Sequence, residues 1–234
     1  MTHHPADSRF VADLGGTQGH FLFSFGHYFD PDNLGLGPLR AFNDVSLAPR
    51  VAGPLHPHVE VEIVTVVLSG TLTYADQTQN LRDVPDANVL RLTAGTGTQH
   101  AESNRGTVPA RALELWFRPG QAGLQPSQEQ KRLDLHTPNR WTPLVSGRGD
   151  GGGEAVFLNC DATVWWANLA PGASLAFAPD AAAGARSLLV YVVSGAATGN
   201  GQPLAPGDQV RLSNERLTLG SATGAQMVVV DVPE

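Results

Sequence analysis

Glycine and proline divide this chain into short segments, and this division limits the secondary structure that it can form. The 234 residues include 26 glycines and 17 prolines, and both residue types disfavour the interior of a helix. The segments between them are rich in Val, Leu, Ile and Thr, which favour strands. The clearest runs are residues 62–68, 89–93, 112–117, 187–193, 209–213 and 226–232. Short strands separated by frequent turns predict an all-β sandwich or barrel.

An internal repeat predicts that two such β units follow each other. Residues 63–73, IVTVVLSGTLT, parallel residues 188–198, LLVYVVSGAAT, and each segment is followed by a strand with an Arg-Leu pair. Between the copies, residues 119–140 show no clear period and contain Pro126 and Pro138. We therefore expect an N-terminal domain over residues 1–125, a linker over 126–145 and a C-terminal domain over 146–234. The glycine-rich residues 146–154 are expected to form a flexible loop.

Two short couplets carry the chemistry of the first unit. They are His56-Pro57-His58 and His100-Ala101-Glu102, and in each the two polar side chains lie two positions apart. Alternate side chains of a strand point to the same face, so each couplet presents two potential ligands to one side. Three imidazoles and one carboxylate suit a divalent first-row transition metal.

Glu62 competes with Glu102 for the carboxylate position. If the strand is regular from His56 onward, Glu60 and Glu62 also point inward. The spacing does not choose between Glu62 and Glu102. A buried carboxylate that binds no metal must be hydrogen-bonded or protonated, so Glu62, if it is not a ligand, would orient a ligand histidine.

The second copy of the repeat lacks every candidate ligand. Transferring the spacing of the first copy places His56, His58, Glu62, His100 and Glu102 on Ala181, Ala183, Ser187, Gly220 and Ala222. Histidines that merely packed a strand would plausibly have survived in part. The sequence therefore predicts one metal site, in the N-terminal unit, and one structural copy.

Several stretches of the N-terminal half resemble the pirin family of bicupin proteins. They are residues 21–30 (FLFSFGHYFD), 39–44 (LRAFND), 56–58, 62–70 (EIVTVVLSG), 93–102 (TAGTGTQHAE) and 115–119 (LWFRP). The resemblance implies two tandem cupin (jelly-roll) barrels, the second degenerate, with a metal held by His56, His58, His100 and Glu102. It also implies iron, although the ligand chemistry admits Mn, Co, Ni, Cu and Zn.

The same resemblance implies an activity like that of quercetin 2,3-dioxygenase. Four protein ligands leave positions open for substrate and O2, which marks a catalytic rather than a structural site. Glu102 would act as ligand and general base, with Glu62 in reserve. Apolar residues such as Phe23, Phe25, Val64 and Val66 would line the pocket for a small aromatic substrate. Asn43 and Asp44 either polarise the substrate or cap a turn, and their residue types favour the turn.

The bulk properties narrow the choice of partners. The net charge is −7 and the chain has no run of Lys or Arg, which argues against binding nucleic acid or an anionic membrane. Cys160 is alone, so we expect a small buried side chain without a disulfide. No apolar run is long enough to span a bilayer, and we expect a monomeric cytoplasmic protein. The alternatives are another class of cupin enzyme, or a non-catalytic iron-dependent regulator that binds a protein partner.

Overall fold

The computed structural model describes residues 1–149, 152–179 and 181–234 of the chain. Almost all regular structure in them is β-strand, with two short 3-10 segments, η1 (Ala6–Ser8) and η2 (Ala181–Ala183). The all-β prediction is therefore confirmed. None of the helical segments described has the length and apolar character that crossing a membrane requires.

The chain forms two compact units. The first, called here the N-terminal unit, comprises Phe10–Leu133 together with Val156–Cys160. The second, the C-terminal unit, comprises Met1–Arg9, Asp134–Ala155 and Asp161–Glu234. Each unit is described by itself below.

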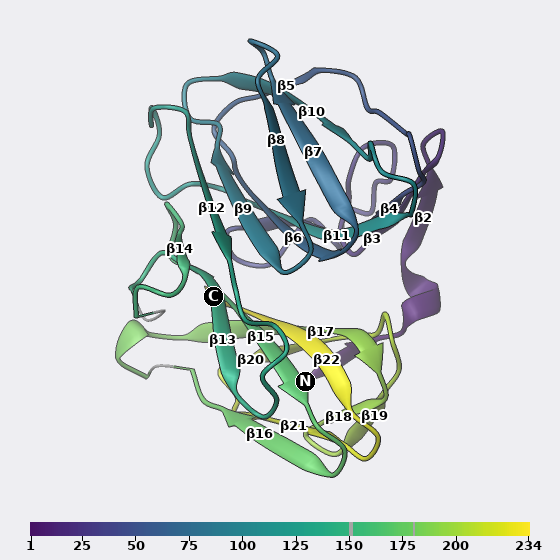
Figure 1. The fold of residues 1–234 in the computed structure, drawn as a ribbon. Coiled ribbons are helices and arrows are strands. Elements are labelled where there is room, and N and C mark those ends of the chain that lie inside the picture. The colour runs from purple at the N-terminus through teal and green to yellow at the C-terminus, as the bar shows by residue number, and fades with distance from the viewer. Residues whose placement is uncertain (150–151, 180) are drawn as a thin grey trace. The chain divides into compact units, whose positions relative to one another are not determined.

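The N-terminal unit contains a large and a small antiparallel sheet, which form separate layers in Figure 1. The large sheet has the order β12-β9-β6-β11-β4-β3-β2 and the small sheet the order β5-β10-β7-β8. The strands are β2 (Phe10–Asp13), β3 (Thr17–Phe21), β4 (Leu39–Leu47), β5 (His56–His58), β6 (Glu62–Ser69), β7 (Thr71–Asp76), β8 (Leu81–Pro85), β9 (Asn88–Thr93), β10 (Thr98–Ser103), β11 (Ala110–Phe117) and β12 (Ser127–Arg132), with the short β14 (Val156–Phe157) beside them. Apolar side chains between the layers make a core that includes Val67, Leu72, Val84 and Leu90.

The C-terminal unit repeats this arrangement. Its large sheet runs in the order β1-β20-β17-β22-β15-β13, and its small sheet in the order β16-β21-β18-β19. The strands are β1 (Thr2–His4), β13 (Trp141–Ser146), β15 (Thr163–Leu169), β16 (Ala173–Phe177), β17 (Arg186–Gly195), β18 (Ala197–Gly199), β19 (Gln202–Leu204), β20 (Gln209–Ser213), β21 (Leu217–Ser221) and β22 (Ala225–Pro233). In the strand orders of the two large sheets, β6 corresponds to β17, β9 to β20 and β11 to β22. Two cupin units, predicted from the repeat, are confirmed.

The serine-glycine pair of the repeat marks the same turn in both units. Gly70 lies between β6 and β7, and Gly195 ends β17 shortly before β18, with φ of 73° and 74°. A Cβ at Gly70 would lie 2.7 Å from the Pro109 carbonyl oxygen, and one at Gly195 would clash with the carbonyl oxygen of Gly224. Only glycine combines this left-handed conformation with such a close approach of a neighbouring strand.

The residue equivalences that we derived from spacing need a correction. The strand that corresponds to β5 is β16, at Ala173–Phe177, whereas Ala181–Ala183 form η2. The transfer failed because it assumed equal loops, and the β16–β17 connection (178–185) is longer than the β5–β6 connection (59–61). The conclusion survives, since neither β16 (ASLAF) nor β21 (LTLGS) carries a histidine or an acidic residue.

Other local predictions were wrong for identifiable reasons. Asn43 and Asp44 do not cap a turn, because both lie buried within β4. Residues 119–140 are not wholly irregular, because β12 pairs with β9 along its length. The predicted loop at 146–154 includes residues 150 and 151, which lie outside the described residues. Cys160 is buried, as expected.

Glu60 breaks the regular strand that would have carried the alternation from His56 to Glu62. Its φ of 52° lies in the left-handed region, which is uncommon for a residue other than glycine. The turn is held by the Glu60 amide, which donates to the Gly95 carbonyl over 2.9 Å. As a result, the His56–His58 couplet belongs to the small sheet while Glu62 begins β6 of the large sheet.

Candidate metal centre

Three histidines from two neighbouring strands converge on one point of the N-terminal unit. His56 and His58 lie on β5 and His100 lies on β10, which pairs antiparallel with β5. The potential ligand atoms of the three side chains all lie within 4.8 Å of one another. No other described group of three or more His, Cys, Asp or Glu side chains converges in this way. The period-two couplets therefore place the imidazoles together as the sequence indicated.

The unpaired imidazole nitrogens fit a bound metal ion. His56 donates its Nδ1 proton to the Pro54 carbonyl over 2.9 Å, which directs the ring and makes Nε2 the nitrogen that could face a metal. His58 Nε2 and His100 Nδ1 are buried and have no hydrogen-bond partner among the described residues. A buried nitrogen without a partner is costly unless something supplies the missing contact. The carbonyl contact to His56 is the kind of orienting hydrogen bond that metal-binding histidines make.

The electrostatics of the cluster keep two of the rings neutral. Burial, followed by the proximity of His56, lowers the pKa of His58 to about 4. Burial also lowers the pKa of His100 to about 3, with smaller contributions from His56 and His58. Because only a neutral imidazole has a lone pair to give to a metal, both rings are ready to bind one at neutral pH.

Glu102 lies beside the three histidines rather than within the group. Its Oε1 is 4.0 Å from Nε2 of His100, and the side chain is 18% exposed. Across the small sheet it pairs with Tyr74, whose hydroxyl lies 2.6 Å from Oγ1 of Thr65. Burial, and then the charge of Glu102, raises the pKa of Tyr74 well above its usual value, so the phenol keeps its proton.

Glu62 occupies a different environment. The side chain is fully buried, and its Oε2 accepts hydrogen bonds from the backbone N–H and from Nδ2 of Asn159, over 3.2 and 3.1 Å. The same amide nitrogen of Asn159 donates to Oγ1 of Thr93 over 3.1 Å. These contacts hold the Glu62 carboxylate in a polar cluster next to β9.

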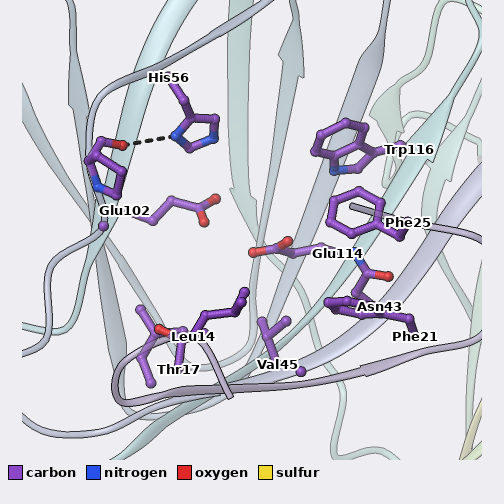
Figure 2. Close-up of a pocket in the computed structure, with 14 residues that line it drawn as sticks. Leu14, Thr17, Phe21, Phe25, Asn43, Val45, His56, Glu102, Glu114 and Trp116 are labelled. Carbon is purple, nitrogen blue, oxygen red and sulfur yellow. Dashed lines mark hydrogen bonds between the residues drawn. The ribbon is translucent and has the colours of Figure 1, made fainter. Parts of the chain in front are cut away.

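A cavity of about 320 Å³ opens beside His56, which is the member of the histidine group that lines it. Its lining is mostly apolar, and Figure 2 shows Glu102 and His56 on one side and Glu114, Asn43, Phe25 and Trp116 on the other. The full lining consists of Leu14, Thr17, Gly19, Phe21, Phe25, Asn43, Val45, Leu47, Gly53, Pro54, His56, Glu102, Glu114 and Trp116. The volume is at the lower end of the range for small-molecule sites.

The predicted walls of the cavity are mostly wrong. Phe25 does line it, but Phe23, Val64 and Val66 are fully buried and do not. The prediction failed because β4 and β11, rather than β6, present their alternate side chains to the cavity. Glu62 does not line it either.

Glu114 is the principal residue that the sequence analysis missed. It lies on β11 and points across the cavity toward Glu102 in Figure 2. Burial, then the charge of Glu102 and a hydrogen bond to it, raises the pKa of the Glu114 carboxyl well above its usual range. The signal was present, because Glu114 is the one charged side chain in the apolar run ALELWF at 112–117.

Comparisons with known proteins agree with this geometry. The family model described as Pirin matches residues 6–117, and the model described as Quercetinase C-terminal cupin domain matches residues 144–232. A pirin-like protein of Caulobacter vibrioides is 31% identical over 229 residues, which is 97% of either chain. The quercetin 2,3-dioxygenase of Escherichia coli K12 is 28% identical over 231 residues, covering 97% of this chain and 96% of that protein.

Solved structures show the same fold. The crystal structure of the bacterial pirin YhhW from Escherichia coli in complex with nickel(II) matches with a TM-score of 0.90 at 25% identity. The match covers 99% of this chain and 98% of that one. A divalent metal in that protein is consistent with the donor set found here.

Proposed function

This chain belongs to the pirin family of bicupin proteins, and from that premise we propose that it is a metal-dependent dioxygenase acting on flavonols such as quercetin. The observation that carries the proposal is the convergence of His56, His58 and His100 on one point, at which His56 lines a mostly apolar cavity. A closed structural site would have no such cavity in front of it. Relatives named quercetin 2,3-dioxygenase supply the substrate class.

The three imidazoles hold the ion in this proposal, and Glu102 supplies the fourth ligand. Glu102 is preferred to Glu62 because its carboxylate faces the cavity, whereas that of Glu62 is bonded to Asn159. We take iron as the ion, as the family resemblance implies. When bound, the ion supplies the redox and Lewis-acid chemistry that O2 and the substrate require.

The side chains around the cavity then have defined tasks. A carboxylate oxygen of Glu102 takes the proton of the flavonol 3-hydroxyl as general base. Tyr74 keeps its proton and hydrogen-bonds Glu102, which fixes the direction of that carboxylate. Phe21, Phe25 and Val45 exclude water from the flat rings of the substrate. In the overall reaction the central ring takes up O2 and opens, and one of its carbons leaves as carbon monoxide.

Quercetin turnover under air tests this proposal. Metal-replete protein is incubated with quercetin, and loss of flavonol absorbance is followed together with release of carbon monoxide. We expect about one carbon monoxide per flavonol consumed, and a loss of at least about 100-fold in rate in His58→Ala, since the ion would no longer be held. His136→Ala, which changes an exposed histidine of the C-terminal unit, is the matched control and should keep the wild-type rate.

A fully metal-loaded protein that consumes none of several flavonols would contradict the dioxygenase proposal. The same metal site would then serve a non-catalytic regulatory role with a protein partner. The variants Glu102→Gln and Glu102→Ala distinguish the role of Glu102 as general base from its role as metal ligand. If Glu102 is the base, both variants lose turnover even where bound metal remains.

A further inference from the structure

The wall of the cavity opposite Glu102 carries polar groups that no described residue satisfies. Asn43 on β4 and Glu114 on β11 are direct partners in the antiparallel ladder, and both line the cavity. Asn43 is 1% exposed, and its Oδ1 has no hydrogen-bond partner in the part of the chain that the structure describes. Trp116 follows two positions after Glu114 on the same face, and its Nε1 is also buried with no partner in residues 1–149, 152–179 or 181–234. Figure 2 shows these three side chains together.

Neighbouring polar side chains show that the fold can satisfy such groups when they are structural. Asp44 follows Asn43 along β4 and forms an ion pair with Arg111, with a shortest distance of 2.6 Å. Nδ2 of the buried Asn104 donates to the carbonyls of Leu47 and Val108 over 3.0 and 2.8 Å. Leaving a buried donor or acceptor unpaired costs about 1–3 kcal/mol. Unpaired groups that face a cavity are therefore a mark of ligand recognition.

Glu114 also keeps an acceptor for a ligand. Glu114 lies across the cavity from Glu102, and its side chain is part of the cavity lining. A carboxyl oxygen of Glu114 can accept from a hydroxyl group of a ligand, and the Asn43 amide can both donate and accept.

The surroundings of these polar groups fit a flat aromatic ligand. Phe21 and Phe25 pack edge to face with ring centroids 5.1 Å apart, and Phe25 and Trp116 do the same at 4.9 Å. All three rings line the cavity. A planar ring that lies against them would bring its edge substituents to the polar wall.

We propose that Asn43 and Glu114 form a recognition site for ring hydroxyl groups of the aromatic substrate and so select hydroxylated flavonols over unsubstituted ones. This inference rests on the proposed function for the substrate class. Asn43 and Glu114 act as specificity-determining residues, separate from the histidines that hold the ion. The Trp116 indole N–H adds a donor to the same wall.

Anaerobic binding separates this selectivity from turnover. Dissociation constants of quercetin and of 3-hydroxyflavone, which lacks the other hydroxyl groups, are measured by calorimetry on metal-loaded protein under nitrogen. We expect Asn43→Leu and Glu114→Leu each to weaken quercetin binding about tenfold, which corresponds to about 1.4 kcal/mol, and to change 3-hydroxyflavone binding less than about twofold. Glu114→Gln keeps an acceptor oxygen and should retain most of the preference. It also provides the test if Glu114→Leu does not fold.

Val45→Ala is the matched control, because Val45 lies two positions from Asn43 on the same face of β4 and lines the cavity without a polar group. It should weaken both ligands alike. Equal changes for the two ligands in Asn43→Leu and in the Glu114 variants, or no change for either, would overturn the inference. Failure of wild type to bind either flavonol would overturn it together with the proposed function. A binding preference without turnover would refute only the dioxygenase reaction, whereas turnover with an unchanged preference in the variants would refute only the recognition site.

Discussion

His56 and His100 lie directly opposite each other on β5 and β10, with their ring centroids 4.7 Å apart. The pair is set by the register of the two strands, and His58 joins it from the next position on the same face of β5. Two adjacent strands of the small sheet therefore supply all three imidazoles, and the site depends on that ladder rather than on a mobile loop.

Removal of one imidazole should remove the metal. We expect His100→Ala to retain less than about one tenth of the metal that wild type keeps after exhaustive dialysis, because two remaining imidazoles bind a divalent ion much more weakly. The measurement is elemental analysis of the dialysed proteins. His136→Ala should match wild type. Equal metal in His100→Ala and wild type would place the ion elsewhere.

Loss of the Asn159 side chain should reduce stability without loss of metal. Asn159→Ala removes the Nδ2 hydrogen bonds to Glu62 and Thr93, which leaves a fully buried carboxylate poorly satisfied. We expect a decrease of about 1–3 kcal/mol in the free energy of unfolding by urea. Metal content after dialysis should stay at the wild-type value. If Asn159→Ala loses its metal as His100→Ala does, then Glu62 acts on the ion.

The matched turns of the repeat should tolerate no side chain. Gly70→Ala and Gly195→Ala combine a left-handed backbone with a clash against a neighbouring strand. Gly201→Ala is the control, because Gly201 has a φ of 83° but nothing within 4 Å of the added Cβ. We expect the control to lose about 1 kcal/mol from backbone strain, and the other two to lose at least about 2 kcal/mol more. Equal losses in all three, measured by urea unfolding, would refute the role of close packing.

Asp208 should make the stability of the C-terminal unit depend on pH. Burial acts to raise the pKa of Asp208, but hydrogen bonds from the Ala205 and Ala6 amides and from His3 outweigh it, so the pKa is lowered overall. A lowered carboxyl pKa adds stability above the unfolded value near 3.9, and that stability is lost as pH falls through the folded value. We therefore expect wild type to exceed Asp208→Asn by about 1–2 kcal/mol at pH 7.

This difference should shrink as pH falls below about 4. Urea unfolding of both proteins across this range provides the measurement. A difference that does not shrink below about pH 4 would show that the charged form of Asp208 is not the stabilising one.

The fold was predictable because the repeat and the couplets report on local geometry. Side chains two positions apart, such as those of His56 and His58, lie on the same face of any strand. The SGT and SGA segments mark a turn that needs a left-handed glycine, and both copies form it. The family resemblance rests on the same segments.

Other features depended on contacts between distant segments. No local pattern shows that Glu60 adopts a left-handed conformation and sends Glu62 into the other sheet. Asn43 has the residue type of a turn, but its place opposite Glu114 is a property of the β4–β11 ladder. Glu114 was visible as a lone acid in an apolar strand, yet its face became clear only when the cavity was located. Iron, the monomeric state and the cytoplasmic location stay predictions.

The C-terminal unit keeps the strand pair that carries the metal site in the N-terminal unit, but with leucine side chains on it. Leu175 and Leu219 lie opposite each other on β16 and β21, much as His56 and His100 do on the corresponding strands. Leu219 is fully buried, so any polar side chain introduced there would need a hydrogen-bond partner or a bound ion. Paired imidazoles at these two positions are consequently the natural starting point for engineering a second ion into the same polypeptide.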